Sequence, residues 1–300
     1  MNKATKTVNY IYDVNQPGGA EKQCRIQSAQ ARVKLIETGG FIRAMLTIHR
    51  SLKNASQATD HVFWLSRDQA LGGIISRLVS NKNNTISYNI RNQPLKFRVS
   101  PRSYIYERIA FLNRVDKWLS NSQSTLDAFS RKYHTKPAHL IVQKNIIETG
   151  HCDWKYEQNV GISIIFVGHP NLLKGFDVLL RFLERMDKEI ECVYIYGFEM
   201  HQITRVERNI LKNFKTRYAG HNDHWFSEAY KNAVLLNTSR SEGYPSAPLE
   251  ALGHGIPILI PRHIIYSKEI EQMYSYDDIM DVSPTTIYDL FERHNEIKSQ

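Results

Sequence analysis

Residues 233–252 read AVLLNTSRSEGYPSAPLEAL, and this stretch decides the fold. Its first four residues form an apolar run of the kind that fills a buried parallel strand. Gly243 and Pro245 then interrupt the chain, and Pro248 stands where a helix would begin, because proline is tolerated at the first helical position. The pattern therefore predicts a strand, a loop that contains Glu242, and a helix with Glu250 in its first turn. In open α/β sheets, ligands bind in the crevice at this end of the strands.

Two carboxylates at this junction can bind a sugar or a nucleoside. A carboxylate accepts hydrogen bonds from two adjacent hydroxyls, such as those of a ribose or a hexose. The backbone N–H groups of residues 244–247 would face a phosphate at the helix N-terminus. The alternative for Glu250 is a structural role, in which it offsets the helix dipole by about 0.3–1 kcal/mol.

The spacing of Glu242 and Glu250 resembles the Glu-x7-Glu signature of the retaining glycosyltransferases of family 4, which have the GT-B fold. The resemblance extends through a turn of small residues and the strand after it: Gly253, Gly255, Ile256, Pro257 and Ile258.

Two further blocks carry the same resemblance. The apolar run 162–167 and Gly168 are followed by His169 and by Lys174-Gly175, which resemble the first strand and loop of the family's nucleotide-binding domain. Gly18 and Gly19, after the predicted strand 8–14, resemble the glycine loop that opens the family's N-terminal domain.

Strands and helices alternate in both halves, which implies parallel sheets and right-handed crossovers. Strands are predicted over 8–14, 61–65, 85–91, 117–121, 139–143, 162–167, 192–196, 216–219, 233–236 and 256–260. No second strand is evident between Gly40 and His61. The predicted fold class is α/β of the GT-B type, with two Rossmann-like domains whose parallel sheets face a central cleft. Residues 1–158 would bind the acceptor, and residues 159–300 would bind the nucleotide sugar.

The basic charge is concentrated in the first half. Residues 1–158 hold 24 Lys and Arg against 11 Asp and Glu, a net charge of +13, whereas residues 159–300 hold 15 against 19, a net charge of −4. Such asymmetry indicates a polyanionic surface or substrate. Arginines interleaved with aromatic residues are the expected contacts with an acceptor or an anionic membrane: Arg91, Arg98, Arg102 and Arg108. A solvated basic face is the alternative, and a nucleic-acid partner is not expected.

Other features restrict the class of protein. The three cysteines, Cys24, Cys152 and Cys192, lie far apart without metal-ligand spacing, so neither a disulfide framework nor a metal site is predicted. No apolar run approaches the roughly 20 residues of a membrane-spanning helix. We expect a cytoplasmic protein, peripheral to the inner face of the plasma membrane.

The resemblance implies transfer of a hexose or N-acetylhexosamine from a nucleotide diphosphate sugar, with retention of configuration and without a metal or cofactor. The acceptor would be a glycan or lipid-linked molecule in bacterial-type surface glycan synthesis. Lys174 and Glu242 would be catalytic: Lys174 would neutralise the departing diphosphate, Glu242 would hold the hexose hydroxyls, and Glu250 would hold the ribose. The implied donor-binding set is Gly18, Gly19, Gly168, His169, Lys174, Gly243, Tyr244, Pro245, Ser246, Ala247 and Glu250.

Two departures from the family pattern leave alternatives open. His169 stands where relatives carry Arg, so Arg240 or a basic residue of the first domain would have to supply the second cation. Near 88–91, where relatives carry His, Arg91 or Asn89 would substitute. The alternative functions are a nucleotide-sugar epimerase of GT-B fold and a non-catalytic polyanion-binding protein of that fold.

Overall fold

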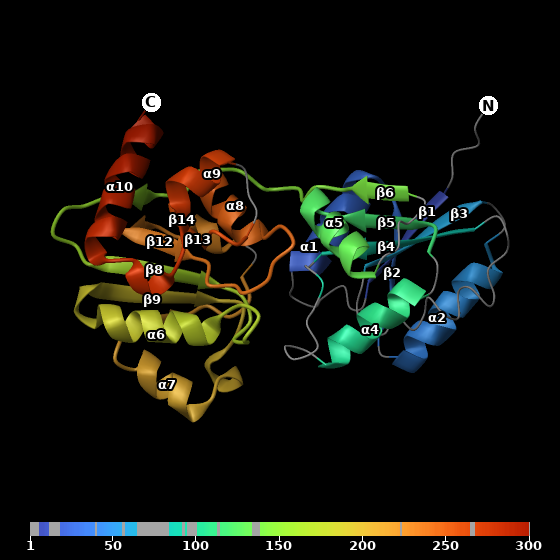
Figure 1. The fold of residues 1–300 in the computed structure, drawn as a ribbon, viewed down its shortest axis with the longest axis horizontal. Helices are drawn as coiled ribbons and strands as arrows, with labels where there is room; N and C mark the ends of the chain where they lie inside the picture. The colour runs from blue at the N-terminus through green and yellow to red at the C-terminus, as the bar shows by residue number, and fades with distance from the viewer. Residues whose placement is uncertain are drawn as a thin grey trace. The chain divides into compact units, whose positions relative to one another are not determined.

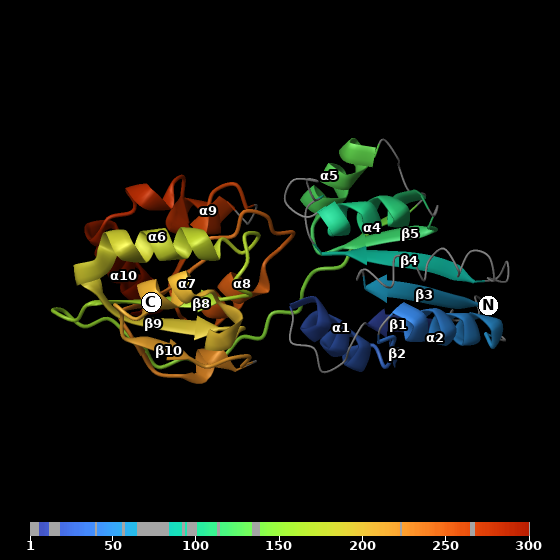
Figure 2. The same cartoon turned by 90° about the horizontal axis from the view of Figure 1, so that it is seen from below.

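The computed structural model divides the chain into two compact units, Met1–Ile146 and Ile147–Gln300. Figures 1 and 2 show each unit as a β-sheet flanked by helices. The structure describes residues 6–11, 19–39, 41–55, 58–64, 84–91, 94, 101–112, 115–133, 139–222, 224–264 and 268–299. Over these residues, no helix has the length and apolar character needed to span a membrane.

The first unit is built on a six-stranded parallel sheet with the order β2-β1-β3-β4-β5-β6. Its strands are β1 (Lys6–Ile11), β2 (Lys34–Glu37), β3 (Thr59–Trp64), β4 (Thr85–Ile90), β5 (Lys117–Ser120) and β6 (His139–Val142). Its helices are α1 (Gly19–Gln30), α2 (Phe41–Lys53), α4 (Pro101–Leu112) and α5 (Gln123–Tyr133). Because side chains alternate along a strand, neighbouring residues of β3 serve two cores. Phe63 packs with Ile48 of α2 and Phe129 of α5, whereas Val62 and Trp64 pack with Cys24 of α1.

The strands predicted from the sequence did not include β2. This strand is a four-residue edge strand, Lys34–Glu37, whose residues are half-buried or exposed. It therefore lacks the apolar run by which the inner strands are recognised.

The second unit has a parallel sheet with the order β10-β9-β8-β12-β13-β14. Its strands are β8 (Ile162–Val167), β9 (Ile190–Tyr196), β10 (Thr216–Tyr218), β12 (Ala233–Leu236), β13 (Ile258–Pro261) and β14 (Ser275–Tyr276), with a separate pair β7 (Trp154–Lys155) and β11 (Tyr230–Lys231). Its α-helices are α6 (Phe176–Met186), α7 (Arg205–Leu211), α8 (Ser246–Gly253), α9 (Lys268–Tyr274) and α10 (Pro284–Ser299). Short 3₁₀ turns cover Asp187–Glu189, Met200–Gln202, Trp225–Ser227 and Ile279–Asp281.

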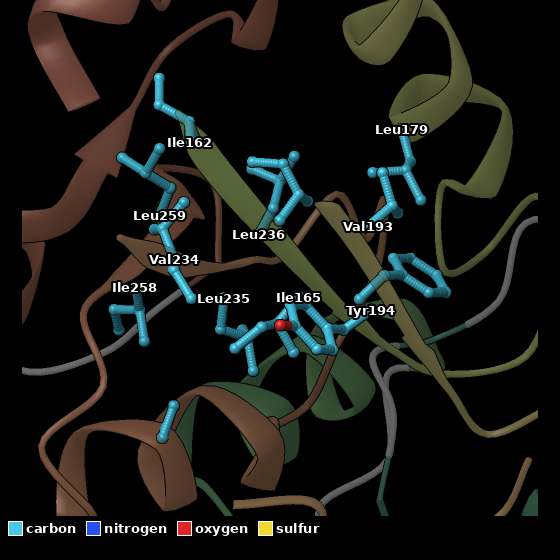
Figure 3. Close-up of a cluster of buried hydrophobic side chains, with 14 of the residues drawn as sticks. Ile162, Ile165, Leu179, Val193, Tyr194, Val234, Leu235, Leu236, Ile258 and Leu259 are labelled. Carbon is cyan, nitrogen blue, oxygen red and sulfur yellow. The ribbon is translucent and has the colours of Figure 1, made fainter. Parts of the chain in front are cut away.

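The core of the second unit confirms the apolar runs as buried strands. All four residues of β12 and the first five of β8 are buried. Figure 3 shows Ile165, Val193 and Leu235 of three neighbouring strands in this core, together with Leu179 of α6. Strand order reverses between β8 and β12, which makes this pair the switch point of a doubly wound sheet.

Residues 147–158 group with the second unit, whereas the sequence prediction placed them in the first domain. Backbone hydrogen bonds explain this grouping: Gly150 donates to the carbonyl of Gly253 at 3.1 Å, and Cys152 donates to that of His254 at 3.0 Å. In addition, the indole of Trp154 is buried in the core of the second unit.

Candidate functional site

The carboxyl ends of β8 and β12 bring two of the three sequence blocks together. These strands are direct neighbours, with Leu235 opposite Ile165. The loop 168–175 leaves β8 and the loop 237–245 leaves β12 at the same edge of the sheet. Ligands of open α/β folds bind at this position.

Lys174 and Glu242 form an ion pair at this edge. The Nζ of Lys174 lies 2.5 Å from Oε1 of Glu242. The same carboxylate oxygen accepts a hydrogen bond of 2.8 Å from the hydroxyl of Ser239. Only 7% of the Glu242 side chain is exposed, against 35% for Lys174, so the cation is the more accessible partner. The pair thus presents a cation to the outside and keeps a carboxylate behind it.

A close backbone contact holds the two loops together. Gly175 has φ +67°, and a Cβ there would lie 1.9 Å from the carbonyl oxygen of Thr238. The hydroxyl of Thr238 donates in return to the carbonyls of Lys174 and Gly175, at 3.0 and 2.9 Å. Only glycine fits this contact, because the conformation is left-handed and the approach is closer than any side chain permits. The Lys-Gly pair therefore couples a cation to the loop that carries Glu242.

Arg240 does not supply a second free cation. Its two Nη atoms bind both carboxylate oxygens of Asp177, at 2.6 and 2.7 Å, and Nη1 also donates to the carbonyl of Leu172 at 2.8 Å. These hydrogen bonds from Arg240 lower the pKa of Asp177, because they favour its charged form. A bidentate pair of this kind fixes the loop rather than leaving a charge available to a ligand.

His169 is also unsuited to be the second cation at neutral pH. Its ring is solvent-exposed, yet partial desolvation, followed by the charges of Lys174 and His221, lowers the pKa of His169 below its ordinary value of 6.5. A histidine with a lowered pKa is neutral at pH 7. Lys174 therefore carries the positive charge of the loop 168–175.

The helix after Glu242 begins two residues earlier than the sequence predicted. α8 starts at Ser246 with Pro245 as its N-cap, and Pro248 is its third residue. Glu250 consequently lies in the second turn, and the prediction that placed it in the first turn is wrong. Its side chain is 4% exposed. Since dipole effects fall off within the first turn, this position weakens the structural alternative for Glu250.

The other predicted donor contacts lie between β12 and α8. Gly243 and Pro245 are buried, whereas Tyr244, Ser246 and Ala247 are half-buried. Because α8 starts at the sheet edge that carries Lys174, the N–H groups of its first turn add a second source of positive potential there.

Three glycines close the neighbouring strands at the same edge. Gly168, Gly197 and Gly220 follow β8, β9 and β10; Gly168 donates to the carbonyl of Tyr196 at 2.9 Å, and Gly197 donates to that of Gly220 at 2.6 Å. A Cβ on Gly197, where φ is +103°, would lie 2.8 Å from the oxygen of Gly168. The sequence analysis assigned a role only to Gly168, although a glycine one or two residues after each of the three strands was the available signal.

The predicted residues of the first unit have four different outcomes. Gly18 and Arg98 lie outside the described residues, and only the backbones of Gly19, the first residue of α1, and Arg102, in α4, are described. Arg108 is exposed on α4. Arg91 differs from the expected surface position, because its Nε and Nη2 atoms are buried.

Among the described residues, no three His, Cys, Asp or Glu side chains form a group suited to a metal ion.

No family model matches the chain. A curated relative, an uncharacterized 41.2 kDa protein in the cps region of Klebsiella pneumoniae, is 27% identical over 168 residues, which are 52% of this chain and 45% of the relative. The chain thus matches about half the length of this relative.

Solved structures show the fold. HepE of Anabaena in complex with UDP-glucose superposes with a TM-score of 0.62 at 10% identity, over 98% of this chain and 89% of HepE. The lipopolysaccharide outer core galactosyltransferase WaaB in its apo form superposes with a TM-score of 0.58 at 14% identity, over 97% of this chain and 95% of WaaB. TarM superposes with a TM-score of 0.60 at 11% identity, but the match covers 84% of this chain and only 54% of TarM. The chain therefore has the GT-B fold, in agreement with the predicted fold class.

Proposed function

We propose that this protein is a glycosyltransferase that binds a nucleotide diphosphate sugar at the carboxyl ends of β8 and β12. The observation that carries the proposal is the pair of Lys174 and Glu242 at this edge, 2.5 Å apart and next to the start of α8. A diphosphate needs a cation and N–H donors, and a sugar needs a carboxylate that accepts hydrogen bonds from its hydroxyls. The loop 168–175, α8 and Glu242 supply all three.

The ion pair suggests how the two groups act together. A diphosphate that binds Lys174 competes with Glu242 for the ammonium group. The freed carboxylate of Glu242, still bound by Ser239, can then accept hydrogen bonds from the hydroxyls of the donor sugar. Donor binding would thereby replace one set of charge-assisted contacts by another rather than bury an unpaired charge.

We further propose retention of configuration and catalysis without a metal, as in the family that the sequence resembles. Charge on the diphosphate grows as the glycosidic bond breaks, and Lys174 together with the first-turn N–H groups of α8 would stabilise it. Glu250 would bind the ribose. No described side chain is assigned as a nucleophile.

The comparisons favour transfer over the alternative functions. WaaB is a galactosyltransferase of lipopolysaccharide outer core, and HepE is seen with UDP-glucose. We infer from these names that the acceptor is a surface glycan or a lipid-linked precursor. An epimerase or a protein that only binds polyanions receives no such support.

The first unit would bind the acceptor and an anionic membrane surface, and the protein would then act at the inner face of the plasma membrane. Two helices of this unit expose apolar side chains beside basic ones. Ile42 and Leu46 of α2 are 72% and 52% exposed next to Arg43 and Arg50, and Ile105 of α4 is 50% exposed next to Arg108. Co-sedimentation with anionic vesicles tests this part, and equal sedimentation of wild type and the variant Arg98→Glu, Arg102→Glu, Arg108→Glu at low salt would contradict it.

Incubation with UDP, GDP and ADP sugars tests the activity. A transferase without its acceptor releases free sugar and nucleoside diphosphate slowly, and one donor of the set should be consumed. An epimerase would instead return an isomeric nucleotide sugar, and a protein that only binds polyanions would leave every donor unchanged.

A further inference from the structure

One half-buried arginine in the first unit has buried donor atoms without hydrogen-bond partners. Arg91 follows β4, and its Nη1 donates to the side-chain oxygen of Asn145. Its guanidinium carbon lies 4.2 Å from the centre of the Trp64 ring. Its Nε and Nη2 atoms are buried and have no hydrogen-bond partner among the described residues.

This guanidinium keeps its charge. Burial lowers the pKa of Arg91 to about 10, so that the group is still protonated at neutral pH. Among the described residues, no carboxylate pairs with it. The other group that affects its pKa is the thiol of Cys24, and burial raises the pKa of that thiol to about 12, which keeps it neutral. A buried charge without a counter-charge is unfavourable, so the position calls for an anion.

The two unsatisfied atoms have the geometry of an anion fork. In a planar guanidinium, the Nε–H and one Nη–H point the same way, and this edge matches the two oxygens of a carboxylate or a phosphate. The contact of Nη1 with Asn145 and the stacking on Trp64 restrain the plane of the group. The fork is therefore held in place before any ligand binds.

Further unsatisfied polar atoms lie on the same face of the sheet. Asn89 and Arg91 are two positions apart in an extended chain, and Asn89 is the register partner of Trp64 on β3. The side-chain nitrogen of Asn89 donates to Gln143 at 3.2 Å, which leaves its Oδ1 as the acceptor. Both Asn89 Oδ1 and Trp64 Nε1 are buried without a partner in the described part of the chain. Beside the fork there are thus one more donor and one acceptor, which suit a hydroxyl.

We propose that Arg91, Trp64 and Asn89 form a binding site for an oxyanion, a carboxylate or a phosphate group carried next to a hydroxyl. The inference rests on the proposed function only where it names the ligand: the acceptor of the transfer would be an acidic or phosphorylated saccharide. Binding of the oxyanion itself requires neither a donor nor turnover.

Isothermal titration of the full chain with three saccharides tests the site: glucuronate, glucose 6-phosphate and, as the neutral control, glucose. We expect wild type to bind at least one of the two anions and not glucose. Binding of glucuronate alone identifies a carboxylate, binding of glucose 6-phosphate alone identifies a phosphate, and binding of both identifies a fork that accepts either. Failure of both anions to bind would overturn the proposal.

Arg91→Met removes the charge and the fork, and Arg131→Gln on the exposed face of α5 is the matched control. We expect Arg91→Met to lower the affinity for the anion by about tenfold or more, and the control to leave that affinity unchanged. Because the unpaired charge is lost, the melting temperature of ligand-free Arg91→Met should equal or exceed that of wild type. A lower melting temperature with unchanged anion affinity would show that Arg91 is structural, and would overturn the site.

Arg91→Lys keeps the test valid if Arg91→Met does not fold. Lysine retains a cation near Trp64 but has no fork, so the affinity of Arg91→Lys for the anion should still be severalfold lower than that of wild type. Equal affinities of the two proteins would contradict the role of the fork. UDP, GDP and ADP titrated into the same samples separate the two proposals. If wild type binds a nucleotide but neither anion, this site alone is refuted, and if wild type binds an anion but no nucleotide, the proposed donor site alone is refuted.

Discussion

The two units share a parallel α/β architecture but treat the cations at their sheet edges differently. In the second unit, Lys174 and Arg240 each contact a carboxylate, Glu242 and Asp177. In the first unit, the guanidinium of Arg91 has an amide and an aromatic ring as its described partners, and two of its three nitrogens have no hydrogen-bond partner among the described residues. A paired cation can exchange its carboxylate for a ligand and return to it. An unpaired buried cation has no such resting partner, so its ligand completes the structure.

Lys174→Ala breaks the paired side of this comparison and should have the largest effect. Diphosphate charge grows as the donor bond breaks, so the maximal rate should fall by about 10²–10³-fold, more than the affinity for the donor sugar. Steady-state kinetics on the donor found by the incubation test measure both, with Lys212→Ala on the exposed end of α7 as the control. A change in KM alone would mean that Lys174 only holds the ground state.

Glu250→Ala tests the buried carboxylate in the second turn of α8. Loss of a charged hydrogen-bond partner costs about 1.5–3 kcal/mol, so we expect donor affinity to fall by about ten- to a hundredfold while the fold persists. Calorimetric titration gives the dissociation constant, and circular dichroism reports the fold. If the affinity matches that of wild type and of the exposed control Glu184→Ala on α6, Glu250 does not touch the donor.

Gly175→Ala tests the coupling between the loops of Lys174 and Glu242. The new methyl group would lie 1.9 Å from the oxygen of Thr238 in a left-handed conformation, so the loops must separate. We expect a loss of unfolding free energy of about 1–3 kcal/mol, together with weaker donor binding. Gly161→Ala is the control, because its φ lies outside the left-handed range and its nearest neighbour, at 3.0 Å, is a side-chain carbon of Glu191. If the two variants have the same free energy of unfolding, the contact between residue 175 and the carbonyl oxygen of Thr238 does not require glycine.

His169→Arg sharpens the comparison with the smallest effect. Wild type should bind a nucleoside diphosphate more tightly as the pH falls through the lowered pKa of His169, because protonation adds a cation beside Lys174. An arginine carries that charge at every pH, so the variant should bind up to about fivefold more tightly at pH 7.5 and lose this pH dependence. The affinities of wild type and His169→Arg for the nucleoside diphosphate at pH 5.5 and 7.5 test this prediction. Identical pH profiles of the two proteins would show that position 169 does not face the diphosphate.

The meeting of Lys174 and Glu242 in the second unit could be predicted from the sequence because it depends on local order. An apolar run, a breaker and a helix start recur at each junction, and parallel strands bring their carboxyl ends to one edge, so the meeting of Lys174 with the loop of Glu242 follows. The start of α8 was misplaced because Pro248 is compatible with any position in a first turn, whereas the hydrogen bonds begin at Ser246.

Other features depended on tertiary contacts that no local pattern encodes. Arg240 meets Asp177 across 63 positions of the chain. Arg91 belongs by sequence to a run of basic and aromatic residues, which is the usual pattern of a surface, and only the packing of Trp64 and Asn145 shows that its donors are buried.

Titration of UDP, GDP and ADP into wild type, Lys174→Ala and Arg91→Met tests the central claim most directly. A free nucleoside diphosphate carries the full charge of the leaving group, so Lys174 should matter more for its affinity than for that of the intact donor. We predict that one of the three nucleotides binds wild type, that Lys174→Ala weakens it by about tenfold or more, and that Arg91→Met leaves it unchanged. Equal binding to wild type and Lys174→Ala, or no binding of any of the three, would contradict a donor site at the ends of β8 and β12.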